Sequence, residues 1–298
     1  MNYRIGVDGG GTNTRAVLID ENADVVGRGE AGTSNHYSVG PDRAVENIRR
    51  AIDAALSGAQ VLEREVTGWG LGLAGACTQV EQSTLFSRLE LVAGTARVVV
   101  DEDAAAAWSG AFAGEAGVIC IAGTGANSFG VGPDGQRARA DGLGPLLGDR
   151  GSGYRIGEAA LRSICSADDG SGPGTTLLRP VLDTFECATV DELVQVVYKP
   201  EFKRDRVASV VPLVFEAAVA GDAVAVGLLK DAGQALAETT LTVLRKLGVA
   251  RVAPVGGVLS QASPVREHYE SVLRAALPDI SIELPIYDAA IGAALLLS

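Results

Sequence analysis

Two short glycine-rich segments have the composition of loops that bind phosphate groups. One runs from Asp8 to Thr14 with the sequence DGGGTNT, and the other runs from Ala122 to Ser128 with the sequence AGTGANS. Because glycine has no Cβ, its backbone N–H groups stay accessible, and successive N–H groups form a concave site for an anion. Asp8 could hold a Mg²⁺ ion through the water molecules that this ion keeps. A purely structural turn is the alternative for each loop alone, but two such loops could bind one polyphosphate from both sides.

Three consecutive acidic residues, Asp101, Glu102 and Asp103, stand between a predicted strand and a predicted helix. Aspartate is a favoured N-cap residue, and such a cap stabilises a helix by about 1 kcal/mol. A carboxylate at the end of a strand could also be a general base, which accelerates a reaction by about 10²–10⁴. The two roles are compatible, because one acid can cap the helix while another reacts.

A second type of glycine turn, Gly256-Gly257, follows a predicted strand at 251–255. Two glycines there would let the backbone approach a flat ligand such as a nucleobase, although a simple turn before the next helix is also compatible with them. Gly292, in an alanine-rich segment close to the end of the chain, instead predicts the close packing of two helices.

The composition argues against several classes of function. Acidic residues outnumber basic residues by 37 to 25, and the net charge of −12 gives no support for a nucleic-acid or membrane partner. No apolar run approaches the roughly 18 residues of a membrane span, and the first residues lack a secretory pattern, so we expect a cytoplasmic protein. The four cysteines include no CxxC pair, which disfavours a structural zinc site. The chain also has no Walker A loop and no G-x-S-x-G turn.

The order of the predicted elements repeats along the chain. The first 114 residues are predicted to fold in the order βββαβαβα, and the second part starts in the same way. Gly9, Gly11 and Asn13 match Gly123, Gly125 and Asn127 at a constant offset of 114 positions. The predicted strands are 3–8, 14–20, 25–30, 68–73, 97–101, 117–122, 127–131, 251–255 and 281–284. Predicted helices begin at 41, 79, 103, 264 and 288.

We therefore predict an α/β protein with two domains built on a duplicated βββαβαβα unit. The first domain spans 1–114, and the second spans 115–287 with a helical insert at about 154–247. A final helix at 288–298 is predicted to pack back onto the first domain. The first glycine loop lies between two strands, which excludes a Rossmann fingerprint because that motif needs a helix after the turn. A duplicated fold would leave a cleft between its halves, and such clefts are common ligand sites.

Together these segments resemble the actin-like ATPase and sugar kinase superfamily, whose two domains have a ribonuclease H-like fold. That superfamily has two phosphate loops, two connecting helices and an adenosine loop. In this chain the candidates for these five parts are, in order along the chain, 6–14, 103–113, 119–128, 252–260 and 288–297. The resemblance covers essentially the full length.

Within the superfamily, the chain most resembles the BadF/BadG-type ATPase family on its N-acetylglucosamine kinase branch. The segment GTSNHY at 32–37 resembles a loop whose asparagine touches the sugar, which implies this role for Asn35, with Tyr37 as a ring contact. The segment Glu102-Asp103-Ala104 is similar to Asn-Asp-Ala of the family, whose aspartate is catalytic, and this implies Asp103 rather than Asp101 as the base.

The segment GDRGSGY at 148–154 resembles a third family loop, whose aspartate binds sugar hydroxyls and corresponds to Asp149. This segment departs from the family pattern at Arg150, where glutamate is usual. Glu102 is a second departure, because it stands where the family has asparagine and puts another charge next to the base.

The resemblance implies a kinase that uses ATP and Mg²⁺ to phosphorylate the 6-hydroxyl of an amino sugar, foremost N-acetylglucosamine, and that forms a homodimer. It implies Asp103 as the base and Asp8 as the anchor of Mg²⁺. Phosphate and nucleotide contacts are implied for Gly10, Gly11, Thr12, Asn13, Gly123, Thr124, Gly125, Gly256 and Gly257. Sugar contacts are implied for Asn35, Tyr37, Asp103, Asn127 and Asp149.

Three other functions stay open. Glucosamine or a broad range of hexoses could be the substrate, and the acidic composition favours cationic glucosamine over a sugar with a lactyl or phosphate group. The resemblance also covers ATPases that activate 2-hydroxyacyl-CoA dehydratases through an iron–sulfur cluster. These need a Lys-Cys-Ala-Ala-Gly-Thr-Gly segment, whereas Cys120 here is expected to be a buried strand residue. A non-catalytic regulator that binds sugar or nucleotide is the third alternative.

Overall fold

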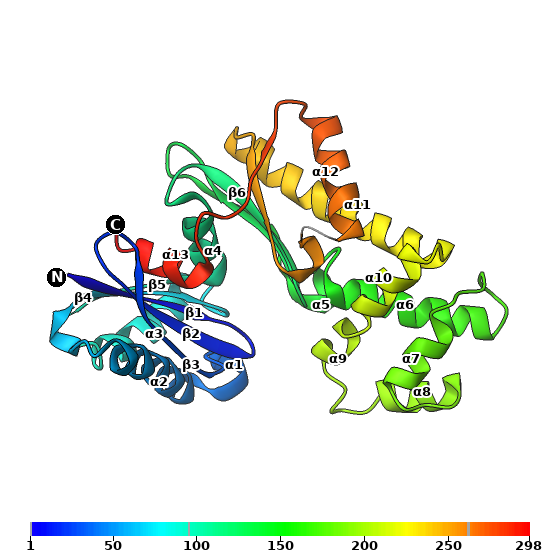
Figure 1. Ribbon diagram of the computed structural model, residues 1–298, viewed down its shortest axis with the longest axis horizontal. Coiled ribbons are helices and arrows are strands. Elements are labelled where there is room, and N and C mark those ends of the chain that lie inside the picture. The colour runs from blue at the N-terminus through cyan, green and yellow to red at the C-terminus, as the bar shows by residue number, and fades with distance from the viewer. Residues whose placement is uncertain (1, 95, 261–262) are drawn as a thin grey trace. The chain divides into compact units, whose positions relative to one another are not determined.

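The computed structural model describes residues 2–94, 96–260 and 263–298 (Figure 1). The chain forms two compact units. The first contains the residues up to Ile119 together with Gly130–Gln136 and Leu284–Ser298, and the second contains Cys120–Phe129 and Arg137–Glu283. The division after Ile119 falls inside the strand at Gly117–Ala122, so it does not mark a boundary between domains. The predicted domain limits at 114/115 and 287/288 therefore stay a prediction.

The first unit is built on a five-stranded sheet with the order β3-β2-β1-β4-β5. The β1–β2 and β2–β3 pairs are antiparallel, and the β1–β4 and β4–β5 pairs are parallel. The strands are β1 (Tyr3–Gly9), β2 (Asn13–Ile19), β3 (Val25–Gly32), β4 (Val66–Leu73) and β5 (Arg97–Glu102). Because helices cover both faces of the sheet, the interior strand β4 is buried at every position except Thr67 and does not alternate.

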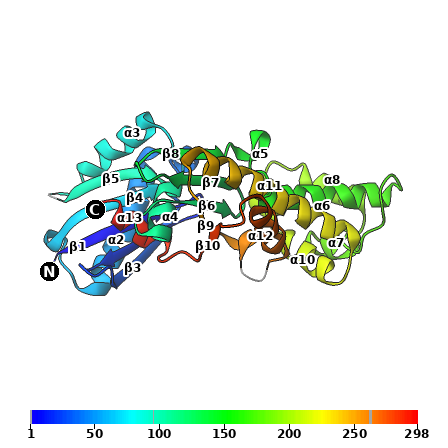
Figure 2. The same ribbon diagram turned by 90° about the horizontal axis from the view of Figure 1, so that it is seen from above.

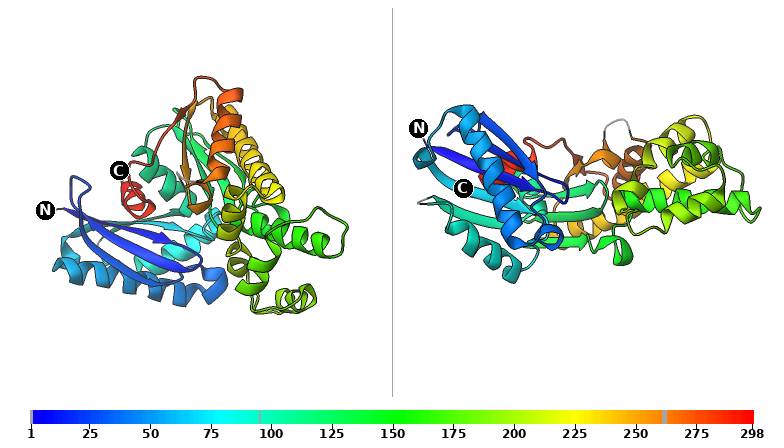
Figure 3. Two further views of the ribbon diagram at one scale, coloured as in Figure 1. Left: turned by 45° about the vertical axis from the view of Figure 1, so that its right-hand side comes forward. Right: turned by 90° about the horizontal axis from the view of Figure 1, so that it is seen from below.

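On one face of this sheet lie α2 (Pro41–Ala59) and α3 (Gln79–Glu90), and on the other lie α4 (Asp103–Phe112) and α13 (Ala289–Leu295), as Figure 3 shows. Pro41 in the first turn favours the start of α2, and a capping box formed by Thr78 and Glu81 starts α3. The unit also contains α1 (His36–Val39) and the 3₁₀ helix η1 (Glu63–Glu65). The core between the sheet and α2 includes Ile5, Leu18, Ile48, Ile52, Trp69 and Leu71.

Glycines let α13 approach the sheet and α4 closely. A Cβ at Gly6 would lie 1.9 Å from the carbonyl oxygen of Ala290, and a Cβ at Gly70 would meet the next turn of α13 at the same distance. Where α13 crosses α4, a Cβ at Gly292 would lie 2.1 Å from the carbonyl oxygen of Ala106. The predicted role of Gly292 in close helix packing is confirmed.

The second sheet has the order β10-β9-β6-β7-β8, which repeats the order of the first sheet when strands are counted within each half. Its strands are β6 (Gly117–Ala122), β7 (Ala126–Val131), β8 (Arg137–Asp141), β9 (Arg251–Val255) and β10 (Ser281–Ile282). The shared order supports the predicted duplication. The sequence pattern missed β8, because its residues RARAD are polar and none of them is fully buried.

Helices make up most of the second unit, and Figure 2 shows the long helix α11 beside α12. A side-chain cap from Asp222 starts α11, and Gly248, with φ of 65°, ends it. Among the described residues no single helix is long and apolar enough to cross a membrane, and one pair bent by 118° passes that test only jointly. The helices are α5 (Gly144–Leu147), α6 (Gly153–Asp168), α7 (Leu178–Thr184), α8 (Val190–Val197), α9 (Arg204–Ala208), α10 (Val211–Val219), α11 (Ala223–Leu247), the 3₁₀ helix η2 (Gly257–Leu259) and α12 (Pro264–Ala276).

Candidate active site

The first glycine loop is the turn that joins β1 to β2. The N–H of Gly10 donates to the carbonyl oxygen of Asn13 at 2.9 Å, and the Thr33 hydroxyl donates to the carbonyl oxygen of Gly10. Within the part of the chain that the structure describes, the N–H groups of Gly11 and Thr12 have no acceptor. A Cβ at Gly11 would meet nothing within 4 Å, so internal packing does not require glycine there. The loop can therefore offer two N–H groups and open space to an anion.

The second glycine loop joins β6 to β7 and is bound to the start of α6. The carbonyl oxygens of Gly123 and Thr124 accept from the N–H groups of Gly153 and Tyr154, at 2.8 and 3.2 Å. The N–H groups of Thr124 and Gly125 donate no hydrogen bond to any residue in the described ranges 2–94, 96–260 and 263–298. A Cβ at Gly123 would meet nothing within 4 Å. This loop has the same properties as the first, with its carbonyl groups held by a helix and two N–H groups available.

The turn after β9 has a structural reason for its first glycine. Gly256 has φ of 99°, and a Cβ there would lie 2.4 Å from the carbonyl oxygen of Ala122, just before the second loop. Gly257 instead faces open space, because no atom lies within 4 Å of its Cβ position. The adenosine role of both glycines stays a prediction, but Gly256 also lets this turn lie against the second loop.

Asp8 lies near the end of β1 in a region of negative charge. The pKa of Asp8 is raised to about 6, mainly by burial and next by the negative charge of Asp103. Asp288 adds to this shift, whereas Arg15 opposes it. Such a region favours a bound cation. In the described ranges no group of three or more His, Cys, Asp or Glu side chains could hold a metal ion.

The raised pKa of Asp8 makes stability depend on pH in a defined direction. Between about pH 4 and pH 6 the folded protein holds a proton on Asp8 that the unfolded chain releases, so this group stabilises the fold less as the pH rises. The free energy of unfolding of Asp8→Asn, relative to that of the wild type, should therefore be higher at pH 7.5 than at pH 4.5. The increase should be at most about 3 kcal/mol. Thermal unfolding of both proteins with EDTA at the two pH values measures this, and a larger gain at pH 4.5 would contradict the assignment.

The three acids at the end of β5 have different environments. Asp101 is 7% exposed and accepts from the N–H of Glu102 at 2.9 Å and from the side chain of Gln82 at 3.4 Å. Asp103 is the first residue of α4, and its carboxylate accepts from the N–H of Ala104 at 2.9 Å. The predicted aspartate N-cap is wrong, because the cap residue is Glu102 and its side chain makes no capping bond. Asp103 already belongs to the helix, so its bond to the N–H of Ala104 is not an N-cap bond.

The Asn35 loop is held by backbone and side-chain contacts inside the first unit. Asn35 is the N-cap of α1, and its side-chain oxygen accepts from the N–H of Tyr37 at 3.0 Å. The Tyr37 ring is 71% exposed, lies 4.3 Å from the His36 ring, and its hydroxyl donates to Glu81. Asn35 therefore has a structural role besides the predicted sugar contact, and Tyr37 presents an accessible aromatic face.

Asn127 and Asp149 lie in the second unit. Asn127 is on β7, and its side-chain oxygen is buried without a hydrogen-bond partner among the described residues. Asp149 is 4% exposed, and its carboxylate accepts from the N–H of Ala126 at 3.3 Å. A Cβ at Gly125 would lie 3.1 Å from the same carboxylate, so Asp149 packs directly against the second glycine loop.

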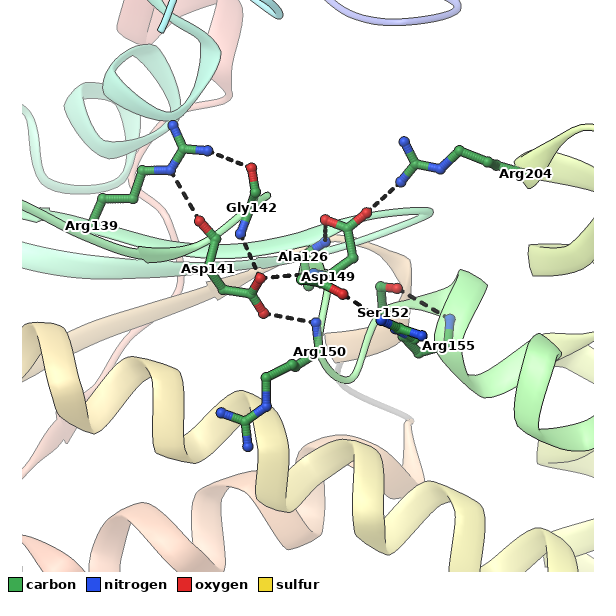
Figure 4. Close-up of polar contacts among 10 residues, drawn as sticks. Ala126, Arg139, Asp141, Gly142, Asp149, Arg150, Ser152, Arg155 and Arg204 are labelled. Atoms are coloured by element: carbon green, nitrogen blue, oxygen red, sulfur yellow. Dashed lines mark hydrogen bonds and ion pairs between the residues drawn. The ribbon is translucent and has the colours of Figure 1, made fainter. Parts of the chain in front are cut away.

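Asp141 and Arg204 are two residues of this region that the sequence did not single out (Figure 4). The Asp141 carboxylate accepts from the N–H groups of Gly142, Asp149 and Arg150, at 2.8, 2.7 and 2.7 Å. Arg204, from α9, forms an ion pair with Asp149. The Asp141-Gly142 dipeptide is a turn signal that could have drawn attention to Asp141. No local signal points to Arg204, because its partner lies 55 positions away.

The departure at Arg150 does not bring its side chain to Asp149. Arg150 extends toward α11, as Figure 4 shows, and pairs there with Glu238. Its N–H, rather than its guanidinium, contributes to the Asp149 turn by donating to Asp141. The residue that stands in place of the usual glutamate therefore bonds to a helix of the second unit.

Comparison with known proteins gives the same assignment over nearly the whole chain. Residues 5–296 match the model of the BadF/BadG/BcrA/BcrD ATPase family. The chain is 31% identical to an N-acetyl-D-glucosamine kinase of Dictyostelium discoideum, covering 98% of this chain and 96% of that one. It is 26% identical to an N-acetylmuramic acid/N-acetylglucosamine kinase of Clostridium acetobutylicum, over 99% and 98% of the two chains. A solved structure of a candidate N-acetylglucosamine kinase from Chromobacterium violaceum is 29% identical, with a TM-score of 0.80 and 99% of both chains covered.

Proposed function

The chain belongs to the BadF/BadG/BcrA/BcrD ATPase family, and we propose that it transfers the γ-phosphoryl group of ATP to the 6-hydroxyl of an amino sugar. N-acetylglucosamine is the first candidate, because kinases of this sugar are similar to the chain over almost its full length. The two-unit fold, with the same strand order in both sheets, agrees with this family.

The observation that carries the sugar site is the unpartnered oxygen of Asn127. A buried acceptor without a donor costs about 1–3 kcal/mol, so such groups are rare unless a ligand satisfies them. Asn127 lies on β7 in the last part of the second glycine segment, and Asp149 packs against Gly125 of the same segment. A sugar hydroxyl or amide N–H bound there would satisfy Asn127 next to the proposed phosphate loop.

Asp103 is the residue that we propose as the general base. Its place at the start of α4 fixes the carboxylate through a bond to Ala104, and the group is partly accessible. Phosphoryl transfer depends on positioning and on charge neutralisation. Neither glycine loop contains a lysine, so backbone N–H groups must carry part of that neutralisation. A Mg²⁺ ion held near Asp8 through water would supply the rest.

The activator alternative is disfavoured by the position of Cys120. Its side chain is fully buried in β6, and burial raises the pKa of its thiol. The thiolate is the ligand form that an iron–sulfur cluster needs. The prediction that Cys120 is a buried strand residue is confirmed.

Three further properties belong to this proposal, two of them implied by the family resemblance and the last expected from the sequence composition. They are the use of Mg²⁺, the homodimer and a cytoplasmic location. Light scattering of the purified chain measures its mass against the 30.5 kDa of one copy. Activity in EDTA with and without added Mg²⁺ tests the metal.

The decisive experiment is an ADP-release assay with Mg-ATP and a panel of sugars. The panel contains N-acetylglucosamine, glucosamine, glucose and N-acetylmannosamine, together with a control without sugar. We expect release that depends on an amino sugar, strongest with N-acetylglucosamine. Release that is independent of sugar, or no release at all, would contradict the kinase.

Asn35 is expected to affect the sugar more than the nucleotide. Asn35→Ala should raise the KM for sugar by about tenfold, which is the value of one good hydrogen bond. Because Asn35 also caps α1, the variant Asn35→Asp is needed, since it keeps the acceptor for the Tyr37 N–H and loses the amide donors. Steady-state kinetics with each substrate varied measure both. A change in the ATP KM alone would show that this loop does not bind sugar.

A further inference from the structure

Arg204 lies at the residue that the proposed sugar site depends on. Its guanidinium pairs with the carboxylate of Asp149, as Figure 4 shows. The Arg204 side chain is 46% exposed, whereas that of Asp149 is 5% exposed. Among the described residues Asp149 is the one acidic partner of Arg204. The Arg204 side chain is therefore partly exposed to solvent beside the buried Asp149 carboxylate.

Close helix packing holds Arg204 in this place. A Cβ at Gly157 on α6 would lie 2.1 Å from the carbonyl oxygen of Val207 on α9, so α9 lies directly against α6. One turn earlier, Gly153 faces Ala208 of α9. The Arg204 guanidinium also lies 5.9 Å from the centre of the Tyr154 ring, which is close enough for a cation–π contact. The backbone, the ring and Asp149 together fix the guanidinium.

The segment that carries Arg204 is basic in an acidic protein. Two of the four lysines of the chain, Lys199 and Lys203, fall within six residues of Arg204, and Arg206 follows it. The acidic residues of the same segment are Glu201 and Asp205. The net charge of −12 predicts repulsion of an acidic sugar, but the segment 199–206 has four basic and two acidic residues and so departs from that average.

The ion pair with Asp149 uses only some of the hydrogen-bond donors of Arg204. A guanidinium has five N–H donors in a planar fork, and one of its terminal nitrogens bonds to Asp149. The remaining donors match the geometry of a second carboxylate, which arginine binds through two parallel hydrogen bonds. Asp149 is expected to bind sugar hydroxyls, so a substituent beside those hydroxyls would lie within reach of Arg204.

We propose that Arg204 is a specificity-determining residue that binds the carboxylate of an acidic amino sugar, such as the lactyl group of N-acetylmuramic acid. This inference rests on the proposed sugar kinase function and extends its substrate class. It reverses the sequence-based expectation that a lactyl group is disfavoured. The kinase of Clostridium acetobutylicum that is named for both sugars is similar to this chain over 99% of its length.

The test compares N-acetylmuramic acid with N-acetylglucosamine in the full-length protein. ADP release with Mg-ATP gives kcat/KM for each sugar in the wild type, in Arg204→Gln and in Arg204→Lys. We expect the wild type to phosphorylate both sugars. Arg204→Gln should lower kcat/KM for N-acetylmuramic acid by about 10- to 100-fold more than for N-acetylglucosamine. Arg204→Lys keeps the charge but loses the fork, so an intermediate loss is expected.

Lys203→Gln is the matched control, because it removes a positive charge next to Arg204 and leaves the pair with Asp149 in place. Its ratio of the two kcat/KM values should equal that of the wild type, and thermal unfolding of each variant shows whether it is folded. A wild type that phosphorylates N-acetylglucosamine alone would overturn the role of Arg204 and leave the kinase intact. Equal losses for both sugars in Arg204→Gln would also overturn it. Inactivity with every sugar would overturn the proposed function together with this inference.

Discussion

Asp103→Asn is expected to lower kcat by at least about 100-fold while the protein still binds sugar. The asparagine keeps an oxygen that can accept from the N–H of Ala104, so the start of α4 stays intact. It cannot take the proton of the sugar hydroxyl, because an amide is not a base at neutral pH. The ADP-release assay measures kcat, and calorimetry without ATP measures the dissociation constant of the sugar.

Two neighbouring acids serve as controls for this variant. Glu102→Gln removes the same charge one residue away and should keep most of the turnover. Asp101→Asn tests the other candidate base, whose carboxylate is 7% exposed and bonded to Gln82 and to the Glu102 backbone. A normal kcat in Asp103→Asn together with a large loss in Asp101→Asn would assign the base to Asp101.

The same substitution has a second readout that does not depend on catalysis. The charge of Asp103 is one cause of the raised pKa of Asp8, second only to burial. Removal of that charge should therefore bring the pKa of Asp8 down toward its ordinary value of 3.8. An unchanged pH dependence of stability between pH 4.5 and 7.5 would show that the two carboxylates are not coupled.

Elements with a local signal could be predicted from the sequence. Helix α2 starts at Pro41 as predicted, because proline fixes the backbone at the first helical turn. The strands around both glycine loops also lie within one residue of their predicted bounds. Strand β8 could not be predicted, since its polar residues reveal no buried face and its place depends on the neighbouring strand β7.

The candidate site shows the same division between local and distant causes. The glycine loops could be predicted because glycine acts through the adjacent backbone. Asp103, in contrast, was distinguished from Asp101 only by the family resemblance, and its catalytic role stays a prediction. The pair of Asp149 with Arg204 joins residues 55 positions apart and depends on the packing of α9 against Gly157. That contact is decided by tertiary structure, so the sequence pattern at 148–154 suggested a carboxylate for sugar hydroxyls but not its cationic partner.

Asp141→Asn is expected to cause the largest loss of sugar binding among changes outside the catalytic base. The Asp141 carboxylate holds three N–H groups, and one of its oxygens alone serves Gly142 and Asp149. An asparagine has one oxygen and one NH₂ group. Its NH₂ would face either the N–H groups of Gly142 and Asp149 or the N–H of Arg150, so at least one hydrogen bond is replaced by repulsion. Hydrogen bonds to a charged group contribute about 1.5–3 kcal/mol each.

The consequence of this loss reaches the sugar through Asp149. Asp149 has φ of 56°, a left-handed conformation that costs about 1–2 kcal/mol for a residue other than glycine. Without the Asp141 carboxylate the turn can relax to an ordinary conformation, which would move the Asp149 side chain away from Gly125 and Ala126. We expect the KM for sugar to rise by about 10- to 100-fold with a smaller change in kcat.

The control for Asp141→Asn is Asp134→Asn. Asp134 accepts from a single backbone N–H, that of Gln136 at 3.0 Å, in an exposed turn, so the amide oxygen of an asparagine can keep this bond. This control should leave both KM values unchanged. Thermal unfolding separates a general loss of stability from a local change at Asp149. If Asp141→Asn lowers stability but keeps the sugar KM, then Asp141 supports the fold and the left-handed turn at Asp149 does not need it. If the KM rises and kcat is retained, Asp141 is a positioning residue that fixes the sugar-binding carboxylate through the backbone.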